Sequence, residues 1–223
     1  MKQAVLFSLM IILFSCGDSG PTQPNEILNL SPVLGRVFVY EVYEYDEFNN
    51  KKPLGMYADT IIAVDTSVSG KNGLYATRSG AGPTFYLRDN MGDILVNPTD
   101  SLSSYTIPFT TLSEKIDSSQ YGSVYAGYYT ITEEIRKVAY LNNETFIIGS
   151  ESLECKKFSV KVISRFYGVI DSKKGLISES LGDFSYVFSP KLCIPVKLYR
   201  LPYFDSVKNE HVLGRVAELS SYK

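Results

Sequence analysis

Apolar and charged residues alternate with a period of two between Lys157 and Phe166. One face of an extended chain would carry the apolar residues Phe158, Val160, Val162 and Phe166. The opposite face would carry most of the charge, at Lys157, Lys161 and Arg165. This period belongs to a β-strand with one buried and one solvent-facing side, and an α-helix has a longer one.

Similar runs recur along the chain and predict further strands. They cover Val37–Asp46, Met56–Thr66, Leu74–Ser79, Thr84–Arg88, Asp93–Asn97, Tyr125–Tyr140, Glu144–Ser150, Phe184–Ser189, Pro195–Leu201 and Val212–Tyr222. Turns are predicted at Asn49-Asn50, Lys71-Asn72-Gly73, Asp89–Gly92, Asn142-Asn143 and Leu181-Gly182-Asp183. Strands joined by short turns are antiparallel neighbours. Seventeen Tyr and twelve Phe residues favour strands as well.

Helical periodicity is nearly absent from this region. One short helix is predicted at Thr111–Ile116, where Thr111 and Glu114 have the spacing of a capping box. The prediction is therefore an all-β domain spanning residues 31–223, with about ten strands. So many strands are expected to curl, because a flat sheet would leave its edges unprotected. We expect a single curved antiparallel sheet that forms a partly open barrel, with a β-sandwich as the alternative.

The first residues predict an export signal. Lys2 precedes an apolar run from Ala4 to Phe14, which is shorter than the roughly 20 residues that a membrane-spanning helix requires. We therefore expect residues 1–15 to be a cleaved signal peptide. The stretch from residue 16 to 30 is rich in Gly, Pro, Ser and Asn, which is typical of a flexible tether.

The sequence Leu13-Phe14-Ser15-Cys16 resembles the lipobox of bacterial lipoproteins. The resemblance implies that Cys16 becomes the lipidated N-terminus and holds the domain at a membrane of the cell envelope. Gly17 follows the cysteine in place of the aspartate that retains lipoproteins at the inner membrane. The outer membrane is the expected location, with the periplasmic and surface faces both open. An ordinary secretory peptide with a chance cysteine is the alternative.

Parts of the domain resemble an uncharacterised group of β-rich envelope lipoproteins. The similar stretches are Gly35–Tyr40, Tyr186–Pro190, Ile194–Lys197 and Glu218–Tyr222. The group offers no catalytic residues, so the resemblance implies fold and location only.

Cys155 and Cys193 remain after Cys16 is assigned to the lipid. Their positions average to 174, so a hairpin turning at Lys173-Lys174-Gly175 would place them opposite each other. An exported domain can keep a disulfide, so this pair is a candidate bond. The alternative is two buried apolar cysteines.

Residues with catalytic or metal-binding chemistry are sparse. His211 is the only histidine, which excludes most multi-histidine metal sites, and an exposed strand position is expected for it. No metal site, cofactor or catalytic residue is predicted. Carboxylates occur at Glu41, Glu44, Asp46, Glu47 and Glu133-Glu134. Glu41 and Glu44 are expected on opposite faces of one strand.

The charge balance argues against nucleic acid as a partner. Without Lys2 the chain has 22 − 1 = 21 basic and 24 acidic residues. The leading hypothesis is a non-enzymatic, membrane-anchored lipoprotein that binds an apolar ligand, a glycan or an envelope protein. The first alternative is a structural or assembly accessory of an envelope complex. The second is a hydrolase with two catalytic carboxylates, which needs a defined separation across a cleft.

Overall fold

The structure is a computed structural model that describes residues 32–64, 67–68, 71–79, 82–97, 104–171, 173–205 and 209–223. The predicted signal peptide, Cys16 and the tether lie outside these residues. The described part contains fifteen strands. They are β1 (Val37–Tyr45), β2 (Lys51–Val64), β3 (Ser67–Val68), β4 (Lys71–Ser79), β5 (Gly82–Arg88), β6 (Ile94–Val96), β7 (Tyr105–Ile107), β8 (Lys115–Tyr125), β9 (Tyr128–Ile148), β10 (Glu151–Ile170), β11 (Lys173–Ser189), β12 (Ile194–Arg200), β13 (Tyr203–Asp205), β14 (Glu210–Val212) and β15 (Gly214–Tyr222).

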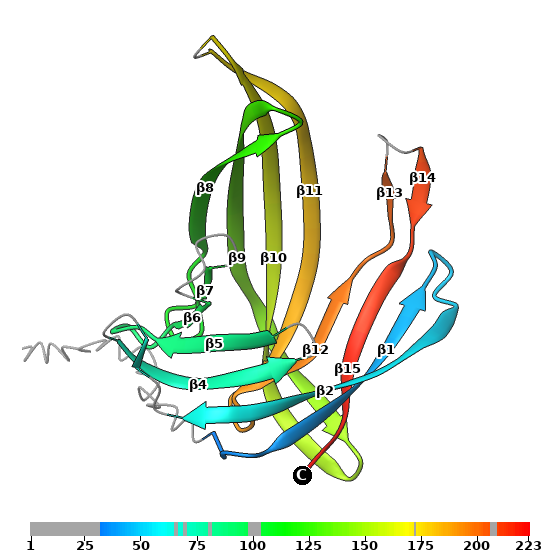
Figure 1. The fold of residues 1–223 in the computed structure, drawn as a ribbon. Coiled ribbons are helices and arrows are strands. Elements are labelled where there is room, and N and C mark those ends of the chain that lie inside the picture. The colour runs from blue at the N-terminus through cyan, green and yellow to red at the C-terminus, as the bar shows by residue number, and fades with distance from the viewer. Residues whose placement is uncertain are drawn as a thin grey trace, which may run out of the picture.

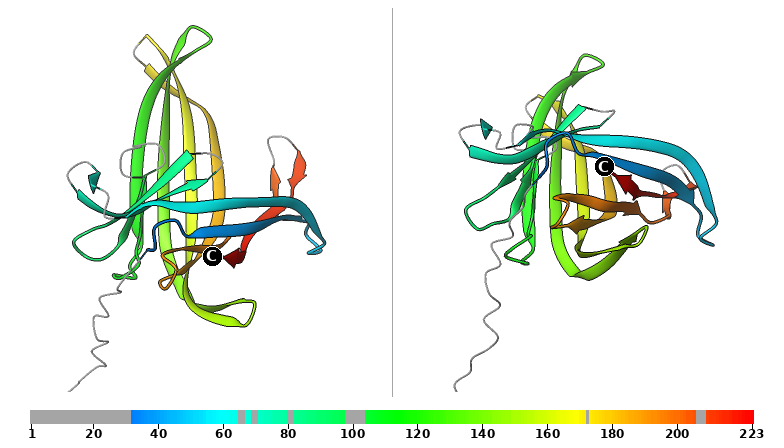
Figure 2. Two further views of the ribbon diagram at one scale, coloured as in Figure 1. Left: turned by 60° about the horizontal axis from the view of Figure 1, so that its bottom comes forward. Right: turned by 90° about the horizontal axis from the view of Figure 1, so that it is seen from below.

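Thirteen strands form one antiparallel sheet in the order β7-β6-β5-β4-β2-β1-β15-β12-β11-β10-β9-β8, with β3 paired to β4. The remaining two, β13 and β14, form a separate arm. The large sheet curves strongly, as the view from below shows (Figure 2). The predicted curved antiparallel sheet is confirmed. Among the described residues, no helix is long and apolar enough to cross a membrane.

The two ends of the sheet, β7 and β8, meet through side chains. The backbone N–H of Thr106 donates to Asp117 Oδ2 at 2.7 Å, and the Thr106 hydroxyl lies 3.2 Å from Asp117 Oδ1. The backbone of β7 pairs with β6 and that of β8 pairs with β9, but β7 and β8 do not pair with each other. The barrel is therefore partly open, as predicted, and a carboxylate bridges the seam.

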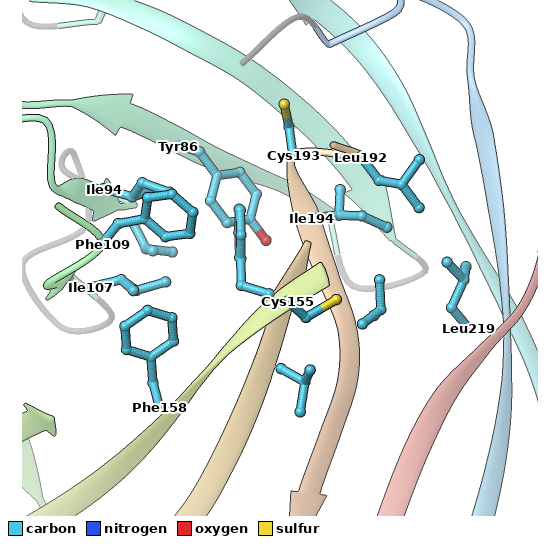
Figure 3. Packing of buried hydrophobic residues seen from close by; sticks show 14 of the residues in the cluster. Tyr86, Ile94, Ile107, Phe109, Cys155, Phe158, Leu192, Cys193, Ile194 and Leu219 are labelled. Carbon is cyan, nitrogen blue, oxygen red and sulfur yellow. The ribbon is translucent and has the colours of Figure 1, made fainter. Parts of the chain in front are cut away.

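The core lies on the inner face of the curved sheet. Strand β1 alternates as its sequence predicts, with Phe38, Tyr40 and Val42 buried and their neighbours more exposed. The period-two strand at Lys157–Phe166 is confirmed within β10, where Phe158 and Val160 are completely buried. Figure 3 shows Phe158 packed near Ile107 and Phe109, which come from the far end of the sheet.

Strands β8 to β11 are long and rise together above the body of the molecule (Figure 1). We call this part the long blade. Its length corrects two predicted turns. Asn142 and Asn143 continue β9 and pair with Lys157 and Lys156 beside a bulge, and Gly182 continues β11 opposite Val162.

Other turn predictions have mixed outcomes. Turns at Asn49-Asn50 and Asp89–Gly92 are confirmed between β1 and β2 and between β5 and β6. Lys71-Asn72-Gly73 instead begins β4, where Lys71 pairs with Val68.

The helix predicted at Thr111–Ile116 is wrong. Leu112 has a left-handed φ of 54°, and β8 begins at Lys115. Thr111 donates its backbone N–H and its hydroxyl to Asp93 rather than starting a helix.

Candidate binding pocket on the inner face

A pocket of about 350 Å³ lies against five strands that are consecutive in the sheet, β2, β1, β15, β12 and β11. Its lining comprises Val42, Tyr57, Phe184, Leu198, Tyr199, Arg200, Arg215 and Ala217. Val42 lies on the same face of β1 as the core residues Phe38 and Tyr40. We call this the arginine pocket.

Arg200 on β12 and Arg215 on β15 are directly opposite each other in the ladder. Like charges in such a position destabilise a sheet. Within the described part of the chain, no carboxylate lies within ion-pair distance of either guanidinium. Glu44 faces Arg215 in the register from β1, but the two do not form an ion pair. The two arginines of the pocket are therefore not neutralised by an ion pair with any described residue.

Leu213 and Tyr203 contact the Arg200 guanidinium. Its Nη2 donates to the Leu213 carbonyl oxygen at 3.2 Å, and its guanidinium lies 5.6 Å from the Tyr203 ring centroid. The Nε atom is buried and has no hydrogen-bond partner among the described residues. A buried donor without a partner costs free energy, so a ligand that accepts from Nε would relieve that cost.

Tyr57 of β2 also lines the pocket. Its ring stacks on Tyr40 with centroids 4.9 Å apart and planes 11° from parallel. Burial, helped by the negative charge of Asp59, raises the pKa of Tyr57 to about 12. The phenol therefore keeps its proton at physiological pH and remains a hydrogen-bond donor.

Asp59 lies two residues beyond Tyr57 on the same face of β2. Its Oδ1 is buried without a hydrogen-bond partner in the described part of the chain. Burial raises the pKa of Asp59 above its ordinary value of 3.8. The ionised carboxylate is thus less favourable in the folded protein than in the unfolded chain.

We predict that Asp59→Asn stabilises the protein at pH 7 by an amount below about 1 kcal/mol, because solvent screens this partly exposed group. An acid with a raised folded pKa costs no stability below its unfolded value of 3.8 and costs most above its folded value. The stability advantage of the variant over the parent should therefore shrink as the pH falls toward 3.8. Thermal unfolding of both proteins between pH 4 and 7 tests this, and a constant difference would contradict it.

A second cleft of about 450 Å³ lies between the β1–β2 turn and the β13–β14 arm. Asp46, Glu47, Phe48 and His211 are among its lining residues. Asp46 accepts hydrogen bonds from the backbone of Phe48 and Asn50 and from the Asn50 side chain. These bonds lower the pKa of Asp46, and the bond from the Asn50 side chain has the largest effect. This carboxylate therefore stabilises the turn. His211 is exposed on β14, as predicted.

The other predicted carboxylates are dispersed. Glu41 accepts from the Tyr43 hydroxyl on the outer face of β1, whereas Glu44 has the opposite parity. Glu133 is bound by Lys174 and Tyr167, and Glu134 by Arg136. None of them lines the arginine pocket, and no cluster of potential metal ligands occurs among the described residues.

Cys155 and Cys193 are not joined by a disulfide. Both are buried, and their sulfur atoms point in different directions (Figure 3). The β10–β11 hairpin turns between Ile170 and Lys173, before the predicted Lys173-Lys174-Gly175, which lie in β11. Its register brings Lys156 opposite Phe188, and Cys193 lies beyond the end of β11. Burial raises the pKa of the Cys155 thiol to about 11, which suits the alternative of apolar core cysteines.

Arg200, Arg215 and Tyr57 are not among the site residues predicted from the sequence. All three lie in predicted strands at positions with inward parity. An arginine at such a position is the signal that the sequence offers for this site. The pairing of β12 with β15 is not visible in the sequence, because these strands are separated by the β13–β14 arm.

No protein-family model and no curated protein matches this chain. Similar solved structures include a candidate lipoprotein from Parabacteroides distasonis, at 15% identity and a TM-score of 0.43, covering 87% of this chain and 98% of that one. A candidate exported protein with a YmcC-like fold from Bacteroides fragilis has 12% identity, a TM-score of 0.42 and the same coverage. The hypothetical lipoprotein YmcC from Escherichia coli has 6% identity and a TM-score of 0.32, covering 82% of this chain and 86% of that one. At these identities no residue role is carried over.

Proposed function

We propose that this chain is a lipid-anchored protein of the bacterial cell envelope, at the outer membrane, whose β-domain binds an anionic amphiphile without chemically changing it. The binding proposal rests on one observation: Arg200 and Arg215, which form no ion pair with any described residue, lie beside apolar and aromatic side chains. The anchoring proposal rests on Leu13–Cys16 and the apolar run before it.

The chemistry of the pocket favours a ligand with a carboxylate or phosphate head. A guanidinium presents a planar fork of N–H donors that matches either group, and two opposed side chains can bind it together. The neutral Tyr57 hydroxyl belongs to the same lining. Val42, Leu198 and Ala217 offer apolar surface for a hydrocarbon segment. Small-molecule sites have volumes of about 300–1,000 Å³. The volume of this pocket, about 350 Å³, is near the lower end and suits the head group and the first part of a hydrocarbon chain.

We expect the purified chain to bind 11-(dansylamino)undecanoic acid more tightly than its uncharged methyl ester. Arg200→Gln and Arg215→Gln should each weaken acid binding by roughly 10- to 100-fold, because each removes a hydrogen bond between charged groups. Binding of the ester should change little. Dansyl fluorescence titration measures both.

The matched control is Arg165→Gln. Arg165 lies on the outer face of β10 and pairs with Glu179, so its removal changes the net charge equally without touching the pocket. Equal weakening by all three substitutions would mean that net charge governs binding, and the pocket would be the wrong site. Identical affinities for the acid and the ester would contradict the anionic head.

Lipid attachment is tested separately. Labelling with a radioactive or clickable fatty acid should mark the parent chain, and Cys16→Ala should abolish the label. Equal labelling of both chains would contradict anchoring through Cys16 and leave the pocket proposal intact.

A further inference from the structure

The far end of the long blade carries a group of exposed apolar and aromatic side chains. Two hairpin ends contribute, the β8–β9 turn and the β10–β11 turn. Val124, Tyr125 and Tyr128 on the first, and Ile170, Leu176 and Ile177 on the second, are each more than half exposed. We call these six residues the blade tip.

The two hairpin ends lie at one end of the molecule. Thr130 of β9 pairs with Gly168 of β10, and Gly168 pairs with Gly175 of β11. The register therefore brings the last residues of all these strands to the same level, and Figures 1 and 2 both show them projecting away from the core. Side chains of both hairpins can enter one surface together.

The charge along the blade changes toward this end. No charged residue occurs from Tyr121 to Thr132. In the second hairpin, Lys173 and Lys174 follow Asp171, whereas the acidic residues Glu133 and Glu179 lie further back along the strands. Lys174 pairs with Glu133, and Lys173 has no ion-pair partner within the described residues. A chain with a net charge of −2 thus presents a tip without surplus negative charge.

We infer that the blade tip inserts into the surface of an anionic phospholipid bilayer. Tyrosine is the residue type suited to this interface, because its ring is apolar and its hydroxyl reaches the head groups. The aliphatic tip residues would enter the acyl boundary, and Lys173 would meet lipid phosphates. This contact requires neither the acyl group on Cys16 nor a ligand in the arginine pocket.

The chain contains no tryptophan, so a single introduced tryptophan reports on one place. We propose Tyr128→Trp at the tip and Phe48→Trp as its control, since Phe48 is an exposed aromatic residue in the β1–β2 turn. Both chains carry Cys16→Ser, which removes the lipid acceptor. Vesicles of phosphatidylethanolamine and phosphatidylglycerol, with and without brominated acyl chains, serve as probe.

Emission from Tyr128→Trp should shift to the blue on vesicles and be quenched by bromine, whereas emission from Phe48→Trp should do neither. Adding Tyr125→Ser and Ile170→Ser to the tip reporter should weaken vesicle binding on the order of tenfold or more, because two anchors are lost. Met56→Ser and Ile62→Ser, at exposed apolar positions on β2, are the matched control and should leave binding unchanged.

Three results would overturn the inference. The first is equal quenching of both reporters, which would place the contact elsewhere. The second is no quenching at the tip. The third is a tip reporter that responds to an envelope protein or to a second copy of the chain but not to vesicles, which would make the tip a protein-docking surface.

Discussion

Replacing Asp93 with alanine is expected to lower the free energy of unfolding by about 3–5 kcal/mol, the range for breaking a buried charge pair. Asp93 is completely buried. Its Oδ1 accepts the backbone N–H groups of Thr110 and Thr111 at 2.8 and 2.9 Å. Its Oδ2 accepts the Thr111 hydroxyl at 2.7 Å and pairs with Lys115 Nζ at 2.9 Å. The substitution leaves all four donors without this acceptor.

The same carboxylate should show in the pH dependence of stability. Burial tends to raise the pKa of Asp93, but the hydrogen bonds from Thr111, Lys115 and Thr110 outweigh it and hold the pKa below its ordinary 3.8. A lowered folded pKa contributes stability above the unfolded value, and this contribution is lost as the pH falls through the folded value. Asp93→Ala should therefore lose less stability than the parent when acidified below about pH 4.

Denaturant unfolding followed by tyrosine fluorescence measures both effects. Asp183→Ala is the matched control, because Asp183 is an exposed carboxylate on β11 and its removal should change stability by no more than about 0.5 kcal/mol. A loss below about 1 kcal/mol for Asp93→Ala would contradict a structural role for this carboxylate.

Much of the sheet could be predicted because apolar and polar residues alternate along a strand that has one buried and one exposed face. This holds for Val37–Asp46, where Phe38, Tyr40 and Val42 are buried, and for the first half of Lys157–Phe166, where Phe158 and Val160 are buried and Val162 and Phe166 are half-buried. Predictions failed where residues typical of a turn or a helix start make other contacts in the folded chain. Asn142 and Gly182 indicate turns, but a long strand can contain them, Asn142 beside a bulge and Gly182 opposite Val162 of the neighbouring strand. The capping pattern of Thr111 and Glu114 failed because Asp93, 18 positions before Thr111, uses the Thr111 donors.

The arginine pocket could not be predicted from the sequence for a related reason. Its lining comes from five strands, and only the β1–β2 and β11–β12 pairs are joined by short turns. The register that sets Arg200 opposite Arg215 depends on β15 returning to lie between β1 and β12. Alternation assigns each arginine to a face of its own strand but says nothing about which strand lies beside it.

Phe109→Ala is expected to cost about 3–5 kcal/mol, the usual range for truncating a buried phenylalanine. Phe109 lies in the turn between β7 and β8 and is almost fully buried. Its ring centroid lies 5.3 Å from Phe188 in an edge-on arrangement and 6.2 Å from Phe158. Lys156 Nζ lies 4.7 Å above the ring and donates to the Phe109 carbonyl oxygen at 2.9 Å. This one residue thus packs the end of the sheet against β10 and β11.

Denaturant unfolding again gives the measurement, with Phe48→Ala as control, because Phe48 is exposed and should contribute little. Phe109→Leu keeps apolar volume and should lose less stability than Phe109→Ala. Equal losses for Phe109→Ala and Phe48→Ala would contradict the packing role.

Phe109 and Asp93 stabilise the same short turn. The Phe109 ring packs into the core, and Asp93 accepts hydrogen bonds from the next two backbone N–H groups, those of Thr110 and Thr111. Once either is removed, the turn is freer to move, and the other has less structure left to stabilise. The double variant Asp93→Ala/Phe109→Ala should therefore lose less stability than the sum of the two single variants, by about 0.5–3 kcal/mol. Strict additivity would mean that the two contacts act independently. A loss smaller than the sum would indicate that side-chain contacts hold the two ends of the sheet together, because β7 and β8 share no backbone ladder.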